Sequence, residues 1–487
     1  MILADPLIVV SNRQPYEHAR DSDRLVCKRT DGGLTSALEP VLRRCGGTWI
    51  AWGSGPADRD VVGPDMSVEV PPESPAYRLR RVWLTQDEIK EGYLGYANQV
   101  LWPLCHITLD RINYLKAFWA GYQSENVRFA EAVLEELDQG PAPVWIHDFQ
   151  LALLPGLVKA AHPIVPVSVF WHIPWPGPDV WRILPERREI LLSLLAADRM
   201  AFQTHSYAEA FLQCVQEFLG GIIPSSRDRV LYKGKETLVT AHPISVDFRT
   251  FSGHACGFPV DEAEMALRER FAVPVGLRLG LGVDRLDYTK GLLKRLWALD
   301  AFFSQFPEYR GKFTFIQVAV PTRGAIDAYQ RYRDLIRETA SEINQRHVTL
   351  FNAELGAKQA WAPIAFHEGR ISFDELLAMY RMADLALVSS VYDGMNLVAK
   401  EYVAAQVYEK GVLLLSQMAG AAEELPGACV INPYETEAVA EAIKEALEMP
   451  LDERRRRMRQ MRLYLAAHDV HAWADRCLSD AFVDASR

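Results

Sequence analysis

Short apolar runs alternate with amphipathic helical patterns along almost the whole of this 487-residue chain. The clearest runs lie at residues 7–11, 48–52, 144–147, 165–170 and 199–203, and again at 277–283, 312–320, 385–389, 411–416 and 428–431. Helical patterns separate them, for example at residues 126–137 and 207–219. Apolar strands that alternate with helices are typical of parallel sheets covered by helices. The sequence therefore predicts an α/β protein whose two halves are of similar kind.

The length predicts more than one domain, because single hydrophobic cores rarely extend beyond roughly 300 residues. A boundary is expected just after residues 241–248, where a strand pattern gives way to a looser stretch. A helical pattern continues on both sides of Pro450, and a last helix at 470–482 carries Trp473 and is expected to dock back on the body. The arginine run at 454–457 lies among acidic residues, which favours a solvated helix face.

One turn stands out for its chemistry. The apolar run at 277–283 leads into Arg285, Lys290 and Gly291, and a helical pattern starts directly afterwards. A strand, a basic turn and a helix N-terminus form a common phosphate site in α/β proteins. The arginine supplies a planar fork and the lysine a point charge, so the turn suits a diphosphate.

A second turn of the same kind follows the apolar run at 385–389. It carries Asp393 and Gly394 and leads into a helical pattern that contains Glu401. Glycine allows a close backbone approach, the first amides of a helix are free donors, and carboxylates accept from hydroxyl groups. The two turns together predict a nucleotide-sugar site.

Composition narrows the compartment and the partners. The net charge of −10 argues against a general nucleic-acid binder. The seven cysteines are scattered without a C-x-x-C pair, which suits a reducing cytosol and offers no structural zinc site. The first residues are interpreted as a strand, and no stretch reaches the roughly 20 apolar residues of a membrane span. We therefore expect a cytoplasmic protein with no membrane partner and no metal or other cofactor, and the sequence leaves open whether it forms a homo-oligomer.

Several motifs appear in order along the chain: Ser11-Asn12-Arg13, Gly32-Gly33-Leu34, Leu101-Trp102-Pro103, His147-Asp148-Phe149-Gln150-Leu151, His172-Ile173-Pro174-Trp175-Pro176, residues 283–291, Pro321-Thr322-Arg323 and residues 393–402. With them the chain resembles, through nearly its full length, the retaining glycosyltransferase family of trehalose-6-phosphate synthase. The resemblance implies a GT-B fold of two Rossmann-like domains facing across a cleft. It implies an acceptor-binding domain at 1–247, a nucleotide-sugar-binding domain at 248–466 and, at 467–487, a C-terminal helix that packs back on the first domain.

The resemblance also implies a reaction and its residues. Glucose would pass from a UDP-, GDP- or ADP-glucose to glucose 6-phosphate with retention, by front-face attack and without a metal. The implied catalytic residues are His172, Asp148, Arg285 and Lys290. The implied donor-binding residues are Gly33, Arg285, Lys290, Asp393, Gly394, Met395, Asn396, Leu397 and Glu401, and the implied acceptor-binding residues are Arg13, Tyr93, Trp102 and Arg323. For His147 a structural role is favoured over a catalytic one.

The acceptor has one alternative. The stretch at residues 12–17 looks more like the related glucosylglycerol-phosphate synthases, which use glycerol 3-phosphate. Arg323 favours the trehalose enzyme instead. Glucose 6-phosphate is the preferred acceptor, and glycerol 3-phosphate stays open as the second.

Overall fold

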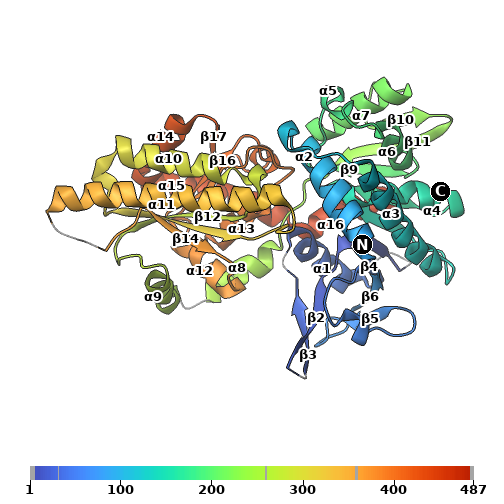
Figure 1. Cartoon of the computed structure of the whole chain (residues 1–487), viewed down its shortest axis with the longest axis horizontal. Helices are drawn as coiled ribbons and strands as arrows, with labels where there is room; N and C mark the ends of the chain where they lie inside the picture. Colours follow the sequence, from blue (N-terminus) through green and yellow to red (C-terminus); the bar gives the residue numbers. More distant parts are fainter. Residues whose placement is uncertain (1–5, 23, 31, 258–259, 357–359, 483–487) are drawn as a thin grey trace. The chain divides into compact units, whose positions relative to one another are not determined.

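The computed structural model of the chain describes residues 6–22, 24–30, 32–257, 260–356 and 360–482. It divides into two compact units, drawn with their elements labelled in Figure 1. Unit 1 comprises Met1–Ile244 and Val470–Arg487, and unit 2 comprises Ser245–Asp469.

Unit 1 is built on one nine-stranded sheet with the order β10-β11-β9-β8-β7-β1-β4-β6-β5. Its strands are parallel except for β10 and β5, which pair antiparallel at the two edges. A separate hairpin consists of β2 (Tyr16–Asp21) and β3 (Arg24–Arg29). The bounds of the sheet strands are β1 (Ile8–Arg13), β4 (Thr48–Trp52), β5 (Ser67–Val70), β6 (Tyr77–Val82), β7 (Val144–His147), β8 (Val167–Phe170), β9 (Arg199–Phe202), β10 (Arg229–Tyr232) and β11 (Lys235–Ala241).

Unit 2 is built on a six-stranded sheet, all parallel, with the order β14-β13-β12-β15-β16-β17. Figure 1 shows α10 and α14 on one side of this sheet and α8 and α12 on the other. The strands are β12 (Arg278–Arg285), β13 (Phe313–Val320), β14 (Ile364–Glu368), β15 (Leu385–Val388), β16 (Val412–Ser416) and β17 (Cys429–Ile431). Two parallel sheets covered by helices confirm the predicted α/β class with two Rossmann-like halves.

The helices that matter below follow the strands in both units. In unit 1 they are α1 (Gly33–Cys45), α2 (Trp102–Cys105), α3 (Lys116–Leu137), α4 (Leu154–Ala161), α5 (Pro178–Trp181), α6 (Arg187–Leu194), α7 (His205–Leu219) and α16 (Val470–Phe482). In unit 2 they are α8 (Phe248–Gly257), α9 (Val260–Arg270), α10 (Leu292–Gln305), α11 (Asp327–Leu355), α12 (Phe373–Met382), α13 (Leu397–Ala405), α14 (Thr436–Glu448) and α15 (Leu451–Ala467).

An unusual helix, η2 (Glu88–Leu101), packs along α3 in unit 1. It is wound as a π-helix, and the side-chain amide of Asn98 donates to the carbonyl of Tyr93, five residues earlier, at 2.7 Å. The crossing with α3 is close, because a Cβ atom on Gly92 would lie 2.8 Å from the carbonyl oxygen of Gly121. Long π-helical stretches are rare and often occur at functional sites, and this one carries the predicted acceptor residue Tyr93.

The C-terminal helix α16 packs within unit 1, where it contacts α1. Trp473 is fully buried, its ring lies beside Trp145 and Phe170 with centroids 5.3 Å away in each case, and its Nε1 donates to the carbonyl of His242. A buried tryptophan of this size contributes a large apolar area. The expected docking of the last helix is therefore confirmed.

The arginine run of α15 is only partly the solvated face that the sequence predicts. Arg456 and Arg457 pair with Glu453 on the helix surface. Arg454, in contrast, is 6% exposed and donates to the carbonyls of Ala446 and Leu447 at the end of α14. Because those terminal carbonyls lack helix partners, a buried arginine ties α14 to α15. For Arg454 the surface prediction was wrong.

Candidate active site

The two predicted donor cations lie at the carboxyl end of β12. The strand ends at Arg285, the 3-10 helix η5 (Tyr288–Lys290) follows, and α10 begins at Leu292. Gly291 has φ 67°, and a Cβ atom there would lie 2.0 Å from the carbonyl oxygen of Ser389. Only glycine accepts both this conformation and this approach. The glycine therefore sets the entry into α10 and the place of Lys290 beside β15.

Lys290 is paired with a second predicted donor residue. Its Nζ lies 2.6 Å from Oδ2 of Asp393, and both side chains keep about a tenth of their surface exposed, 13% and 10%. The same carboxylate oxygen accepts from Ser390 Oγ at 3.0 Å and Asn396 Nδ2 at 3.2 Å. A diphosphate that binds Lys290 would compete with Asp393 for its ammonium group. The predicted grouping of Lys290, Asp393 and Asn396 is thus found in one place.

The loop that carries Gly394 and Met395 packs against the 3-10 helix η7 (Gly420–Glu423). The amide of Ala421 donates to the carbonyl of Met395 at 3.0 Å, and a Cβ atom on Gly420 would lie 2.2 Å from the Gly394 carbonyl oxygen. Asn396 caps α13 by accepting from the Ala399 amide at 3.0 Å. The first amides of α13, from Leu397 on, have no acceptor within the helix. Such amides suit sugar hydroxyls or phosphate oxygens.

A buried arginine that the sequence analysis missed supports both turns. Arg295 on α10 is 1% exposed, and its Nη1 donates to Asp284 Oδ2 at 2.6 Å and Gln317 Oε1 at 2.7 Å. Its Nε donates to Ser389 Oγ at 3.1 Å. These partners lie in β12, in β13 and directly after β15, so one guanidinium links three neighbouring segments next to the donor turn. Helical periodicity places Arg295 on α10 but cannot reveal these partners.

Glu401, the predicted ribose ligand, lies on α13 next to Tyr380 of α12. The tyrosine hydroxyl donates to Glu401 Oε2 at 2.8 Å. Desolvation raises the pKa of Glu401, and the tyrosine hydrogen bond opposes that rise. Tyr380 therefore orients the carboxyl group and helps to keep it an acceptor.

Arg323, predicted to bind the acceptor, lies in unit 2 beside the donor turn. It follows β13, has φ 47°, and its Nη1 donates to Asp287 Oδ2 at 3.0 Å. The side chains of Arg323 and Asp287 are 5% and 0% exposed. The structure thus links a predicted acceptor residue to the same turn as Arg285 and Lys290, through a carboxylate that the sequence analysis did not single out.

The other predicted acceptor residues lie in unit 1. Arg13 ends β1, and its Nη2 lies 3.4 Å from the hydroxyl of Tyr93. The Tyr93 ring packs on Trp52 with centroids 5.5 Å apart. Trp102 begins α2 directly after η2, is 5% exposed and packs against His106 and Phe149. The structure therefore brings Arg13 and Tyr93 together and makes Trp102 largely a packing residue.

Gly33, the predicted amide donor to the diphosphate, is the first residue of α1 in unit 1 and is exposed. The amides of the first helical turn have no intrahelical acceptor. Gly33 has no side chain that could block an anion there, and the helix dipole favours negative charge at this end.

His147 and His172 form a buried pair at the ends of β7 and β8. His147 Nδ1 lies 3.0 Å from His172 Nε2, and His172 Nδ1 lies 3.2 Å from Gln203 Nε2. Gln203 accepts the amide of Ile244 on its oxygen at 2.9 Å, so its nitrogen must donate to His172. His172 is then protonated on Nε2 and donates to His147. Both ring nitrogens of His172 are engaged within the protein.

Burial keeps this pair neutral. Desolvation lowers the pKa of His172 to about 3, and it lowers the pKa of His147 well below the ordinary range. Asp148 follows β7 at φ 75°, and its Oδ1 accepts the amide of His172 at 3.3 Å. The predicted residues Asp148 and His172 therefore lie together, and the pair supplies hydrogen bonds and packing rather than charge.

A buried carboxyl group next to β1 is hydrogen-bonded to an amide. Glu125 on α3 is fully buried, and its Oε1 accepts from the side-chain amide of Asn12 at 2.8 Å. Desolvation, reinforced by the charge of Glu88, raises the pKa of Glu125 well above its ordinary value. Asn12 directly precedes Arg13, so a neutral carboxyl group supports the segment that presents a predicted acceptor residue.

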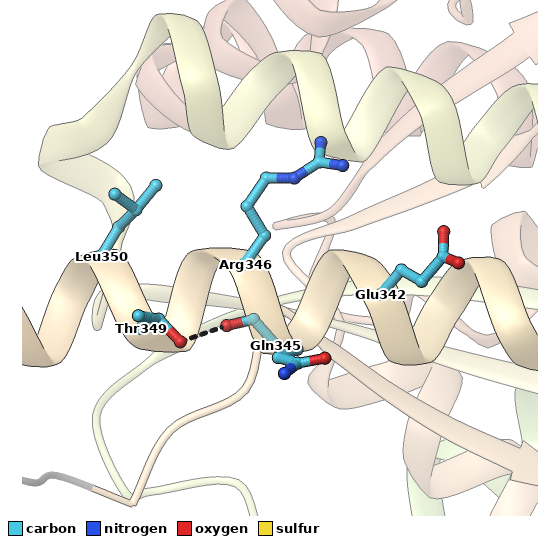
Figure 2. A pocket seen from close by; sticks show the side chains of 5 residues that line it. All are labelled: Glu342, Gln345, Arg346, Thr349 and Leu350. Atoms are coloured by element: carbon cyan, nitrogen blue, oxygen red, sulfur yellow. Dashed lines mark hydrogen bonds between the residues drawn. The ribbon is translucent and has the colours of Figure 1, made fainter.

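The described residues contain no group of three or more histidine, cysteine, aspartate or glutamate side chains that could hold a metal ion. Among the same residues, no helix has both the length and the apolar character needed to cross a bilayer. Figure 2 shows a surface depression whose lining residues all come from the single helix α11: Glu342, Gln345, Arg346, Thr349 and Leu350. A depression along one helix encloses little space, and none of these residues belongs to the predicted site.

The comparisons with known proteins agree with this geometry. A model of glycosyltransferase family 20 matches residues 5–482. The UDP-forming α,α-trehalose-phosphate synthase of Pichia angusta is 34% identical over 487 residues, covering 96% of this chain and 97% of that protein.

Two solved structures are also similar. The UDP-forming α,α-trehalose-phosphate synthase of Burkholderia xenovorans in complex with glucose-6-phosphate superposes with a TM-score of 0.86 at 30% identity, over 98% of this chain and 99% of that one. A structure from E. coli bound with UDP-2-fluoro glucose has a TM-score of 0.85 at 30% identity, over 98% of both chains. Sequence and fold agree over nearly the full length, and the chain belongs to glycosyltransferase family 20.

Proposed function

We propose that this chain is an α,α-trehalose-phosphate synthase, which transfers glucose from a nucleoside diphosphate glucose to glucose 6-phosphate with retention of the α configuration. The observation that carries the proposal is the donor turn. Lys290 pairs with Asp393 at 2.6 Å, in the turn between Arg285 at the end of β12 and the N-terminus of α10. Two cations at a helix N-terminus suit a diphosphate leaving group.

The chemistry follows from the leaving group. As the bond between the glucose anomeric carbon and the diphosphate oxygen breaks, negative charge grows on that oxygen, and the fixed cations Arg285 and Lys290 stabilise it. The acceptor hydroxyl oxygen forms the new bond on the same face, and its proton passes to the leaving phosphate oxygen. Asp393 and the amides of residues 394–397 hold the transferring glucose, and Glu401 holds the ribose. Asp148 and neutral His172 act by hydrogen bonding and orientation.

The acceptor is glucose 6-phosphate, held by Arg13, Tyr93 and Arg323. The stretch at residues 12–17 resembles the glycerol 3-phosphate enzymes, but the structure gives this resemblance little weight as support for glycerol 3-phosphate. Gln14 is 1% exposed and bonds Asp58 at 2.6 Å, and Tyr16 is 5% exposed and bonds Glu39. Both side chains serve the interior of unit 1, so they carry little information about the acceptor.

We assign acceptor binding to the domain at 1–247 and nucleotide-sugar binding to the domain at 248–466, with the segment 467–487 returning to the first. We further propose that the protein acts in the cytoplasm, and the scattered cysteines, none of them in a C-x-x-C pair, support this. Its partners are then small molecules, a UDP-, GDP- or ADP-glucose and a sugar phosphate, with no nucleic acid, no membrane and no metal cofactor.

The test is an activity matrix that crosses UDP-, GDP- and ADP-glucose with glucose 6-phosphate and glycerol 3-phosphate. Nucleoside diphosphate release gives kcat/KM for each of the six pairs. The Lys290→Ala variant, whose donor turn is damaged, measures background hydrolysis.

We expect one donor to dominate and glucose 6-phosphate to exceed glycerol 3-phosphate in kcat/KM with it. A preference for glycerol 3-phosphate would replace the acceptor and leave the donor site standing. If no nucleotide glucose is turned over with either acceptor, the proposed function is wrong.

A further inference from the structure

One buried carboxylate connects the donor turn to the proposed acceptor arginine. Asp287 is 0% exposed. Its Oδ1 accepts from the backbone amide of Thr289 at 3.1 Å and from Thr289 Oγ1 at 3.0 Å, inside the turn. Its Oδ2 accepts from Arg323 Nη1 at 3.0 Å and from the hydroxyl of Tyr329 at 3.4 Å. One side chain thus bonds the donor turn with one oxygen and the acceptor arginine with the other.

The charges around Asp287 also come from both the donor turn and the acceptor arginine. Although burial opposes it, the charges of Arg323, Arg285 and Lys290 lower the pKa of Asp287, so the group is an anion. The three cations that act on it are the ones assigned to the acceptor phosphate and the donor diphosphate. A guanidinium is planar with its donors in fixed directions, so anchoring Nη1 to Asp287 sets the plane in which Arg323 presents its other donors.

Arg323 also needs an anchor. Its φ of 47° lies in the left-handed region, which non-glycine residues seldom adopt. Tyr329 supports the arginine as well, because its hydroxyl bonds Arg323 and its ring centroid lies 5.4 Å from the guanidinium carbon. The strained loop conformation is held by its contacts with Asp287 and Tyr329.

We propose that Asp287 is a positioning residue that orients Arg323 for the acceptor phosphate and holds it in register with the donor turn. This inference rests on the proposed function, in which Arg323 binds the acceptor. Asp287 touches neither substrate, and it acts through the arginine.

The experiment is a double-mutant cycle with Asp287→Asn and Arg323→Ala, measured as acceptor KM and as nucleoside diphosphate affinity by calorimetry. Asn can keep the Thr289 bonds with its oxygen, but it removes the anion and turns an NH₂ group towards Arg323. We expect the acceptor KM to rise about tenfold in Asp287→Asn, as for loss of a charge-assisted contact. Nucleoside diphosphate should bind as tightly as before or more tightly, because a negative charge near Arg285 and Lys290 is gone.

The cycle separates positioning from general damage. If Asp287 acts through Arg323, adding Asp287→Asn to Arg323→Ala should change the acceptor KM less than twofold. A tenfold effect of Asp287→Asn that persists in the Arg323→Ala protein would overturn the inference. So would a parallel loss of nucleotide binding and acceptor binding in the Asp287→Asn single variant. If Arg323→Ala leaves the acceptor KM unchanged, the proposed acceptor role of Arg323 is wrong. That result differs from those that would refute only the positioning role of Asp287.

Asp287→Asn leaves a buried arginine beside a lost partner, and the protein can fail to fold. Tyr329→Phe keeps the ion pair and removes one hydroxyl that bonds both Arg323 and Asp287. We expect a rise of about threefold in acceptor KM with unchanged nucleotide affinity. An unchanged acceptor KM in this variant would contradict the positioning role.

Discussion

Around the donor turn of unit 2, each buried carboxylate lies against a cation, whereas beside β7 and behind β1 of unit 1 the buried titratable groups are neutral. Asp284 meets Arg295, Asp287 meets Arg323 and Asp393 meets Lys290. In unit 1, burial is the main cause that keeps His147, His172 and Glu125 uncharged, and the charge of Glu88 adds to it at Glu125. Paired cations can exchange their carboxylates for phosphates, and neutral groups can only direct hydrogen bonds. The contrast supports the proposed anion site at the donor turn of unit 2.

The largest expected effect comes from removing a cation of the donor turn. Replacing Arg285 or Lys290 by Ala should lower kcat/KM by roughly 10²-fold or more, since a preorganised charge stabiliser is removed. Nucleoside diphosphate affinity measured by calorimetry should fall in parallel. Lys294→Ala is the matched control, because Lys294 lies in the first turn of α10, and its Nζ lies over the rings of Trp297 and Tyr434 instead. Equal affinities in folded Lys290→Ala and Lys294→Ala proteins would refute the donor site.

The claim that Glu125 is uncharged can be tested through the pH dependence of the free energy of unfolding. The pKa of Glu125 is higher in the folded than in the unfolded protein, so at pH values above the unfolded pKa of about 4.5 folding takes up a proton. The contribution of this group to the stability of the fold therefore falls as the pH rises. Glu125→Gln removes that dependence. Its advantage in unfolding free energy over the wild type should therefore grow by about 1.4 kcal/mol per pH unit above that pKa, up to the folded pKa. Denaturant unfolding at pH 5, 6 and 7 measures it.

Glu88 provides the opposite control on the neighbouring helix η2. Although burial opposes it, hydrogen bonds from Thr85, Ser124 and Arg128 lower the pKa of Glu88. Its contribution to stability is therefore present above the unfolded pKa and is lost as pH falls through the folded pKa. Glu88→Gln should destabilise the protein at neutral pH and less so in acid. A pH-independent difference for Glu125→Gln would show that Glu125 is not held neutral.

A smaller effect is expected from Arg13, an exposed cation at the end of β1 in unit 1. Arg13→Ala should raise the acceptor KM about tenfold through loss of a charge-assisted phosphate contact. The donor KM should stay within twofold. Tyr93→Phe removes only the hydroxyl that lies 3.4 Å from Arg13, so its effect should be weaker. If the donor KM rises instead, Arg13 belongs to the donor.

The smallest effect is predicted for metal removal. In the proposed donor site the cations that neutralise the diphosphate belong to the chain, so dialysis against a strong chelator should cost at most a modest part of the activity. Free Mg²⁺ can still assist by binding the nucleotide. Abolished activity that one divalent ion restores fully would argue against Arg285 and Lys290 as the main charge stabilisers.

The sequence predicted those features that depend on residues close together along the chain. The runs at 48–52 and 144–147 match β4 and β7 residue for residue, and the strand, turn and helix around Lys290 were found from apolar patterning and one glycine. It missed the β2–β3 hairpin and the π-helix η2, because neither repeats the dominant strand and helix pattern.

The missing parts of the candidate site are long-range pairs. Asp287 and Arg323 are 36 residues apart, and Asn12 and Glu125 are 113 apart. A carboxylate in a sequence does not reveal whether it will meet a cation or only an amide once buried. The same limit explains Trp102, which a motif marks as a ligand but which the structure largely buries.

The most direct test of the central claim is the stereochemistry of the product. Wild-type protein, a nucleoside diphosphate α-glucose and glucose 6-phosphate should be followed by NMR from the first turnovers. We predict a single disaccharide phosphate whose two anomeric centres are both α, formed in step with nucleoside diphosphate. A β configuration at the transferred glucose, or nucleotide release without a disaccharide, would contradict the account.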